Sequence, residues 1–220
     1  MQKIGIIFDM DGTLWDSAKG VAGSWTDIIQ KNYDPDMEIT EADVKGVMGM
    51  TMDKIAEKLF PKLSEDERTA LLDKCCDAEN DYLREHGGLV YDGFDETMKS
   101  LKALSSNEHD IHLYIVSNCQ KGYIEAFLDH YDYWKYFDDI ECYGNNNLVK
   151  GDNIRLVMER NSLDKAYYVG DIQGDYDSSV EAGAGFIHAK YGFGTINAKV
   201  PVIGALVELP GVIETILSNN

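Results

Sequence analysis

The sequence predicts an α/β protein whose doubly wound parallel sheet carries an all-helical insertion close to its beginning. Two observations lead to this fold class. Short apolar runs rich in β-branched residues alternate along most of the chain with amphipathic helical patterns, and one long early segment has helical patterns only. Strands that alternate with helices form parallel sheets through right-handed crossovers. Functional loops are then expected at the carboxyl ends of the strands.

The predicted strands are short, apolar and far apart in the chain. They lie at residues 3–8, 112–116, 166–169 and 185–188. Helical periodicity separates them, at residues 94–104, 123–130, 153–160 and 175–182. The alternation of the two patterns predicts strands buried beneath helices.

Residues 17–87 lack a convincing strand, so we expect a separate small helical domain there, with residues 1–16 and 88–220 forming the core. Ser64 and Glu67 have the spacing of a capping box, in which each side chain binds the backbone N–H of the other residue. The helix that begins there is expected to end at Gly87 and Gly88, since glycine tolerates the backbone conformation that terminates helices.

Charge and composition exclude several classes of function. The chain has 20 basic and 39 acidic residues, a net charge of −19, which disfavours binding to nucleic acid or to an anionic membrane. With 44% hydrophobic residues it can bury a core. No apolar run approaches the roughly 18 residues of a membrane helix, and the short apolar run at residues 4–8 leads us to expect no signal peptide. We therefore expect a cytoplasmic protein, by default a monomer, with reduced cysteines.

The first candidate site follows the first predicted strand. Asp9 and Asp11 are separated by one residue, and Gly12 lets the backbone turn so that both acids face one pocket. A solvated turn whose aspartates cap backbone amides explains this short motif equally well. The motif alone does not decide between the two interpretations.

A second pair of acids, Asp171 and Asp175, follows another predicted strand. Acids at the ends of two parallel strands meet at one edge of the sheet, where they join Asp9 and Asp11. Their mutual repulsion calls for a cation, and a set of oxygen ligands suits Mg²⁺. Asp171 and Asp175 also have the positions of a helix N-cap and first turn, a role compatible with metal binding.

Two further features complete a candidate phosphoryl site. Ser117 and Asn118 follow the strand at residues 112–116 and supply hydroxyl and amide donors, and Lys150 supplies a positive charge. Each of these residues alone has an ordinary structural explanation, as turn chemistry or as a solvated lysine. The prediction of phosphoryl binding depends on their combination.

In this order the four clusters resemble the motifs of the haloacid dehalogenase superfamily. The motifs are IIFDMDGT around Asp9, YIVSN ending at Asn118, the lone Lys150, and GDIQGD from Gly170 to Asp175. The resemblance extends to the phosphatase branch with an α-helical cap between the first two motifs, which includes phosphoglycolate phosphatases and β-phosphoglucomutases. It implies a Rossmann-like core, with residues 17–87 as the cap.

The resemblance also implies the role of each residue. Asp9 is the nucleophile that becomes an aspartyl-phosphate, and Asp11 is the general acid and base. Lys150 neutralises charge, and the phosphoryl oxygens are bound by Gly12, Thr13, Ser117, Asn118 and Lys150. The Mg²⁺ ligands are Asp9, the carbonyl of Asp11, Asp171 and Asp175. Asp175 either binds the ion itself or holds a group that binds it.

Asp11 discriminates among activities within the family. Members that break carbon–halogen bonds lack this aspartate, so the resemblance implies a phosphatase acting on a small phosphorylated metabolite. A sugar phosphomutase is the main alternative. Residues 47–52, expected to face the site, contain three methionines and no basic side chain for a second phosphate, which favours hydrolysis. A non-catalytic binding module on the same fold is the third possibility.

Overall fold

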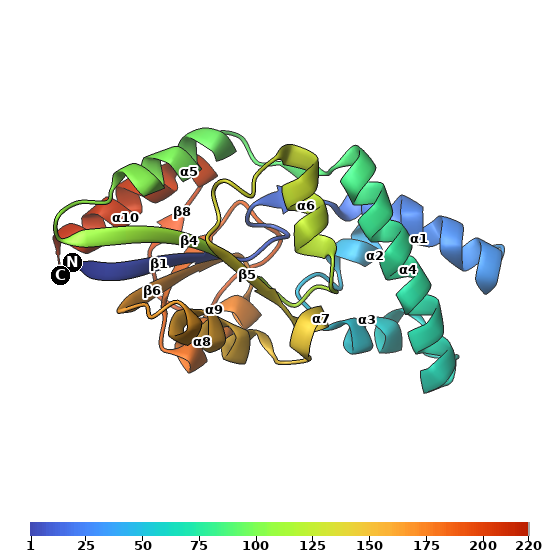
Figure 1. The fold of residues 1–220 in the computed structure, drawn as a ribbon. Coiled ribbons are helices and arrows are strands. Elements are labelled where there is room, and N and C mark those ends of the chain that lie inside the picture. Colours follow the sequence, from blue (N-terminus) through green and yellow to red (C-terminus); the bar gives the residue numbers. More distant parts are fainter. Residues whose placement is uncertain (220) are drawn as a thin grey trace.

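A computed structural model describes residues 1–219 and shows a parallel sheet of six strands in the order β5-β4-β1-β6-β7-β8 (Figure 1). The strands are β1 (Gln2–Phe8), β4 (His109–Ser117), β5 (Asp139–Cys142), β6 (Lys165–Gly170), β7 (Gly185–Ala189) and β8 (Val202–Ile203). All five pairings between neighbouring strands are parallel. The predicted α/β class with a doubly wound, Rossmann-like sheet is therefore confirmed.

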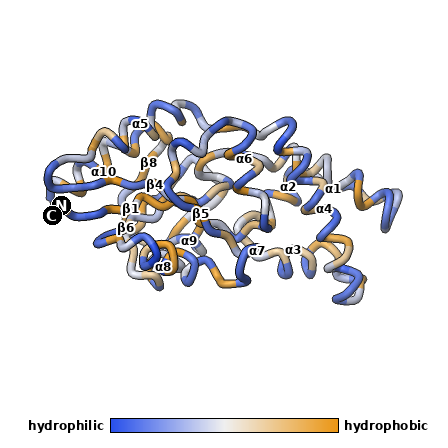
Figure 2. Tube along the Cα trace, viewed as in Figure 1, coloured by the Kyte–Doolittle hydropathy of each residue, from blue (hydrophilic) through white to orange (hydrophobic). Residues whose placement is uncertain are grey.

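All four predicted strands are present, and the sequence patterns missed the two edge strands. β5 has four residues and includes two acids, while β8 has two residues. Neither segment is long enough or apolar enough to show a strand pattern. The central strands are the apolar ones, as the colouring by hydropathy in Figure 2 shows, and their carboxyl halves are completely buried.

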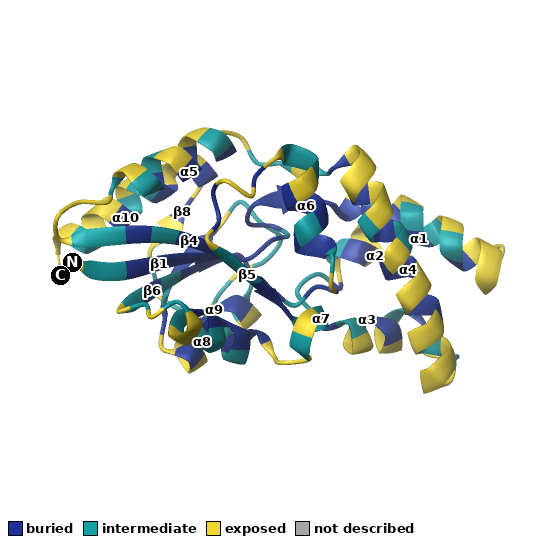
Figure 3. Cartoon of the chain, in the orientation of Figure 1, coloured by how far each residue is buried: buried dark blue, intermediate teal, exposed yellow. Residues whose placement is uncertain are grey.

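Helices cover both faces of the sheet (Figure 1). α8 (Lys150–Arg160) packs against α9 (Gln173–Ala182), and α10 (Leu209–Ser218) packs against α5 (Phe94–Ala103). The remaining elements of the core are α6 (Tyr123–Tyr131), α7 (Tyr143–Asn146) and the 3₁₀ helix η1 (Leu206–Glu208). Figure 3 shows the buried side of these helices turned toward the sheet. The four helices expected in the core are present, with α8 and α9 each beginning two or three residues earlier than predicted.

Residues 18–86 form four helices at the end of the molecule opposite the two termini (Figure 1). They are α1 (Ala18–Asn32), α2 (Glu41–Lys45), α3 (Met52–Leu59) and α4 (Glu65–His86). The chain enters through β2 (Trp15–Asp16) and returns through β3 (Leu89–Val90), which pair antiparallel. The two connections between the sheet and these helices therefore lie side by side.

Both ends of α4 follow the predicted capping chemistry. The Ser64 hydroxyl accepts from the Glu67 N–H, and the Glu67 carboxylate accepts from the Ser64 N–H at 3.0 Å. At the other end Gly87 has a φ of +69° and donates its N–H to the Leu83 carbonyl. Within residues 1–219 no helix combines the length and the apolar character needed to span a membrane.

Aromatic packing holds the connection at β2 against α6. Trp15, fully buried in β2, meets Tyr123 and Phe127 of α6 edge to face, with ring centroids 5.5 Å and 4.9 Å apart. Contacts of this kind add to the stabilisation that burial alone supplies. Trp15 thus fixes the position of Tyr123, whose hydroxyl reaches the candidate site.

The strand order places a topological switch point at β1. From β1 the chain passes to β4 and β5 on one side, then returns to β6, β7 and β8 on the other. Ligands bind in sheets of this type in the crevice at the carboxyl ends of the strands where the order reverses. The loops after β1, β4 and β6 border this crevice.

The capping box predicts the effect of Ser64→Ala. Removing the hydroxyl leaves the Glu67 N–H without its acceptor, and we expect the free energy of unfolding to fall by about 1 kcal/mol. Ser64→Thr keeps an acceptor at the same position and should retain most of the stability. Urea unfolding of the three proteins measures the difference, and equal midpoints for Ser64→Ala and the parent protein would contradict the assignment.

Candidate active site

Three of the predicted site residues lie at the ends of three adjacent strands. Asp9 follows β1, Ser117 is the last residue of β4, and Asp171 follows β6. The Asp9 N–H donates to the Val169 carbonyl at 2.9 Å, which ties the end of β1 to β6. Asp9 and Asp171 are 3% and 1% exposed, so both acids are held away from solvent.

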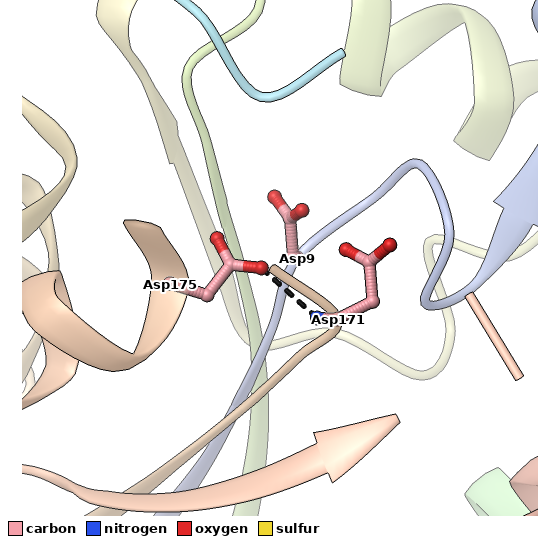
Figure 4. Close-up of side chains that lie close together, drawn as sticks. All are labelled: Asp9, Asp171 and Asp175. Carbon is pink, nitrogen blue, oxygen red and sulfur yellow. Dashed lines mark hydrogen bonds between the residues drawn. The ribbon is translucent and has the colours of Figure 1, made fainter. Parts of the chain in front are cut away.

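Asp9, Asp171 and Asp175 form a compact cluster in which one ligand atom of each lies within 4.8 Å of the others (Figure 4). Asp175 reaches the cluster from the first turn of α9. Its Oδ2 accepts from the N–H groups of Asp171 at 3.0 Å and Ile172 at 3.2 Å. The predicted first-turn role of Asp175 is confirmed, whereas the N-cap residue is Ile172 and Asp171 precedes it.

Lys150 binds two members of this cluster. Its ammonium group lies 2.9 Å from Asp9 Oδ1 and 2.6 Å from Asp175 Oδ1, and its side chain is almost completely buried. Burial by itself lowers the pKa of Lys150, but the charges of Asp175 and Asp9 outweigh burial and raise it. The lysine therefore stays charged inside the protein.

The single lysine leaves the three acids with an excess of negative charge. Burial raises the pKa of Asp9 to about 6, with Asp175 adding to the shift and Lys150 opposing it. Burial followed by repulsion from Asp175 and Asp9 raises the pKa of Asp171 to about 8. Buried carboxylate oxygens with raised pKa values are a donor set that fits a divalent cation such as Mg²⁺.

Asp11 lies outside this group of three and points its carboxylate toward the helical segment. Its Oδ1 accepts from Ser17 Oγ at 2.8 Å and from Tyr123 Oη at 2.7 Å. Burial raises the pKa of Asp11 to about 7, against the effect of these two hydrogen bonds, while the charge of Asp9 adds to the rise. Burial is the largest cause of this rise, and the charge of the neighbouring Asp9 is a smaller one.

The turn after Asp9 has the predicted geometry. Gly12 has a φ of +80°, and its N–H donates to the Trp15 carbonyl at 2.9 Å. A side chain at this position would also collide with the carboxylate of Asp171. Thr13 is fully buried, and its hydroxyl has no hydrogen-bond partner among residues 1–219.

Ser117 and Asn118 face the loop between α2 and α3. The Asn118 Nδ2 donates to the Gly49 carbonyl at 2.9 Å, and both residues line one cavity together with residues 47–50. Met48 and Gly49 also line the cavity that contains Asp9 and Asp171. Part of the 47–52 loop therefore lies against the candidate site, and Gly49 contacts Asn118 directly.

Lys45 is a residue that the sequence analysis missed. It lies two residues before the stretch described as free of basic side chains, and it lines the cavity that contains Asp9 and Asp171. Its ammonium group is 2.9 Å from Asp16, 2.6 Å from Glu41 and 5.2 Å from the centroid of the Phe193 ring. In the sequence, the only indication that Lys45 lies near the site is its proximity to residues 47–52.

Glu79 is a second missed residue. It projects from α4 into the interior, is 4% exposed, and accepts a hydrogen bond from Trp25 Nε1 at 2.6 Å. Burial raises the pKa of Glu79 to about 8, although hydrogen bonds from Trp25 and Gln120 oppose the change. In the sequence Glu79 stands among other charged residues of α4, so nothing distinguishes it from a solvated acid.

Comparison with known proteins agrees with this architecture. The model of the haloacid dehalogenase-like hydrolase family matches residues 6–189. No curated protein matches the chain.

Three similar solved structures extend over nearly the whole chain. A predicted phosphatase from Clostridium acetobutylicum is 25% identical, with coverage of 98% of this chain and 100% of that one and a TM-score of 0.77. A predicted phosphoglycolate phosphatase from Haemophilus somnus 129PT is 20% identical, with coverage of 94% and 96% and a TM-score of 0.75. A subfamily IA hydrolase of the haloacid dehalogenase superfamily from Geobacter sulfurreducens is 17% identical, with 95% coverage of each chain and a TM-score of 0.68.

The raised pKa of Glu79 predicts how stability depends on pH. The folded protein keeps the Glu79 proton up to about pH 8, whereas the unfolded chain releases it near 4.5, so folding binds a proton between these values. The stabilising contribution is complete below 4.5 and is lost as the pH rises toward 8. Glu79→Gln cannot titrate.

We therefore expect the free energy of unfolding of the parent protein to fall relative to that of Glu79→Gln, by a few kcal/mol between about pH 5 and about pH 8. Urea unfolding in metal-free buffer at both pH values measures this difference. The exposed Glu85 of the same helix provides a control, because Glu85→Gln should leave the pH dependence unchanged. A constant difference between the parent protein and Glu79→Gln would contradict the shift.

Proposed function

Because the chain belongs to the haloacid dehalogenase-like hydrolase family, we propose that it is a Mg²⁺-dependent phosphatase of small phosphorylated metabolites. The observation that carries the proposal is the buried group of Asp9, Asp171 and Asp175 with Lys150 at the switch point of the sheet. The 25% identity to a predicted phosphatase over nearly the whole chain gives further support.

In the proposed reaction Asp9 is the nucleophile. A carboxylate oxygen of Asp9 attacks phosphorus, the bond from phosphorus to the ester oxygen breaks, and an aspartyl-phosphate forms. The ion pair between Lys150 and Asp9 Oδ1 fixes the carboxylate and reduces its repulsion of the incoming phosphate. Water then attacks phosphorus, which releases inorganic phosphate and restores Asp9.

Asp11 is the proposed proton donor and acceptor. It gives its proton to the departing ester oxygen, and in the second step it takes a proton from the attacking water. A pKa of about 7 suits both tasks, because each protonation state is populated near neutral pH. The hydrogen bonds from Ser17 and Tyr123 hold one oxygen of Asp11, which leaves the other free to face the substrate.

A bound Mg²⁺ would supply positive charge that offsets the phosphoryl oxygens and the carboxylates around them. Asp9 and Asp171 are the side chains that we assign as its ligands, together with the backbone carbonyl of Asp11. Both oxygens of Asp175 already accept hydrogen bonds, from Lys150 on one side and from backbone amides on the other. This arrangement favours Asp175 as the residue that positions Lys150 and the loop after β6.

The phosphoryl oxygens are assigned to groups around the same crevice. Ser117 contributes its hydroxyl, Asn118 its amide, Lys150 its charge, and Gly12 and Thr13 belong to the turn after Asp9. The positive φ of Gly12 holds this turn next to Asp171. The unpaired hydroxyl of Thr13 is one more candidate partner within the part of the chain that the structure describes.

A phosphomutase remains the second candidate, and one observation favours it. Lys45 lines the cavity beside Asp9 and is the type of residue that would bind a second phosphate. However, Asp16 and Glu41 already pair with its ammonium group. A second phosphate would have to compete with both carboxylates, so the geometry supports hydrolysis better.

Substitution of the nucleophile tests the proposal. We expect the parent protein to release phosphate from p-nitrophenyl phosphate with Mg²⁺, and Asp9→Asn to lose this activity because an amide does not attack phosphorus. Removing the metal with EDTA should also stop the reaction. The exposed Asp81 offers a matched control, since Asp81→Asn makes the same chemical change on the surface of α4.

Two results would contradict the proposed function. Undiminished phosphate release in Asp9→Asn would exclude Asp9 as the nucleophile, and undiminished release in EDTA would exclude the dependence on metal. A sugar phosphate that is converted into an isomer without release of phosphate would instead identify a mutase.

A further inference from the structure

A second cavity adjoins the proposed catalytic groups, between the helical segment and the loop after β4. We call it the side cavity. Its volume is about 40 Å³, which is room for only a few small groups. Most of its wall is apolar or aromatic, with Trp25 of α1, Met50 of the 47–52 loop, Ile55 of α3 and Tyr123 of α6 among the contributors. None of these side chains takes a chemical step in the proposed reaction.

The side cavity shares part of its lining with the cavity that contains Asp9 and Asp171. Asp11, Met48 and Gly49 line both spaces. The proposed proton donor Asp11 must lie beside the ester oxygen that leaves. The alcohol part of the substrate therefore lies on the side of Asp11 away from the three-acid cluster, which is where the side cavity is found.

The ionisable groups around the side cavity are acids. Asp11 and Glu79 line it, and no Lys, Arg or His side chain within residues 1–219 does so. Lys45 lines only the neighbouring space and is paired there with Asp16 and Glu41. An anionic group on the alcohol would thus lie beside two acidic side chains, and no unpaired cationic side chain of residues 1–219 would line the space around it.

Two polar groups in this wall, Glu79 and Asn118 Oδ1, have no cationic donor among residues 1–219. Glu79 is buried, and its hydrogen bonds come from the neutral indole of Trp25 at 2.6 Å and from the neutral amide of Gln120, so no cationic side chain among residues 1–219 pairs with it. Asn118 Oδ1 is buried without any hydrogen-bond partner in the described residues. Burial of such groups is unfavourable unless a donor satisfies them, and a cation satisfies a carboxylate best.

We propose that the alcohol part of the substrate carries a protonated amine that binds Glu79, so that the enzyme hydrolyses phosphate monoesters of small amino alcohols. This inference rests on the phosphatase function proposed above and specifies its substrate class. Without such a ligand Glu79 keeps its proton up to about pH 8. Binding of an ammonium group favours the carboxylate form, so Glu79 releases this proton to solvent, and the ammonium group donates to the carboxylate and to Asn118 Oδ1. The aromatic rings of Trp25 and Tyr123 give a cation additional stabilisation.

The same chemistry makes Glu79 a specificity-determining residue. A carboxylate or a second phosphate on the alcohol gives Glu79 no cation to pair with, and no Lys, Arg or His side chain among residues 1–219 lines the side cavity to bind such an anion. Esters such as 2-phosphoglycolate should therefore be poor substrates, even though one structurally similar protein is named a predicted phosphoglycolate phosphatase. The rate for an ester whose alcohol carries a neutral hydroxyl should lie between the rates for the amino ester and for the anionic ester.

Three esters of equal length test the inference on the unmodified protein. With Mg²⁺ present, we expect kcat/KM for 2-aminoethyl phosphate to exceed that for 2-hydroxyethyl phosphate by about tenfold to a hundredfold, because a hydrogen bond between charged groups replaces a neutral one. The value for 2-phosphoglycolate should be the lowest. A rate for 2-aminoethyl phosphate equal to or below that for 2-hydroxyethyl phosphate would overturn the inference.

Glu79→Gln tests the residue itself. The amide oxygen can still accept from Trp25, but the amide cannot ionise to pair with an ammonium group, so the preference for 2-aminoethyl over 2-hydroxyethyl phosphate should fall about tenfold or more. A purely structural role in holding Trp25 would lower both rates by the same factor and leave the preference unchanged, which would overturn the assignment. Glu85→Gln, on the exposed face of the same helix, should keep the preference of the parent protein.

Binding to Asp9→Asn gives a readout that needs no turnover. Calorimetry with this variant should rank the three esters in the same order, and substitution of Glu79 in addition should remove the advantage of 2-aminoethyl phosphate. An unchanged advantage in the double variant would count against Glu79.

The experiments distinguish an error in the proposed substrate class from an error in the proposed phosphatase function. If p-nitrophenyl phosphate is hydrolysed and 2-aminoethyl phosphate is not preferred, only the substrate class is wrong. If no phosphate ester is hydrolysed, the phosphatase proposal fails and the inference fails with it.

Discussion

The proposed active site depends on one buried interaction, the contact of Lys150 with Asp9 and Asp175. Taking these charges out of water is costly, and only close pairing and further hydrogen bonds offset the cost. Both distances are below 3 Å, and Asp175 is also held by two backbone amides. Lys150 occupies the first turn of α8, where the helix dipole disfavours a positive charge. The neighbouring carboxylates evidently outweigh that effect, because they raise the pKa of the lysine.

From this ion pair a chain of contacts leads to the helical segment. Asp11 stands two residues after Asp9 and binds Ser17, at the entrance to α1, and Tyr123 of α6. Asn118 binds the carbonyl of Gly49. Movement of the helices relative to the sheet would therefore alter the surroundings of the proposed proton donor. Asp11 and Asn118 also line the side cavity, so the proposed proton donor and the proposed substrate pocket depend on the same few contacts.

The central strands and the charged motifs could be predicted from the sequence because their signals are local. An apolar run that ends in Asp9 or Asp171 marks a buried strand with an acid at its carboxyl end. The strand order then brings acids more than 160 residues apart into one cluster, as the rule for parallel sheets requires. The edge strands β5 and β8 were not predicted, because each is too short to show the apolar pattern of a buried strand.

The surroundings of the site could not be predicted, because they depend on tertiary packing. Tyr123 reaches Asp11 across 112 positions of the chain, and no pattern in α6 indicates this contact. Glu79 is buried because α4 packs against α1, so that Trp25 covers it. For the same reason the raised pKa of Asp11 comes mainly from burial, a quantity that spacing between acids does not reveal.

The most direct test of the central interaction is the stability of Lys150→Met in metal-free buffer. Methionine keeps the length and apolar character of the side chain but leaves Asp9, Asp171 and Asp175 without a cation. We predict that urea unfolding will show a loss of about 3–5 kcal/mol relative to the parent protein. The same change at the exposed Lys62 should alter the free energy of unfolding by less than about 0.5 kcal/mol. Equal stabilities of the two variants would contradict the claim that Lys150 holds the acids together.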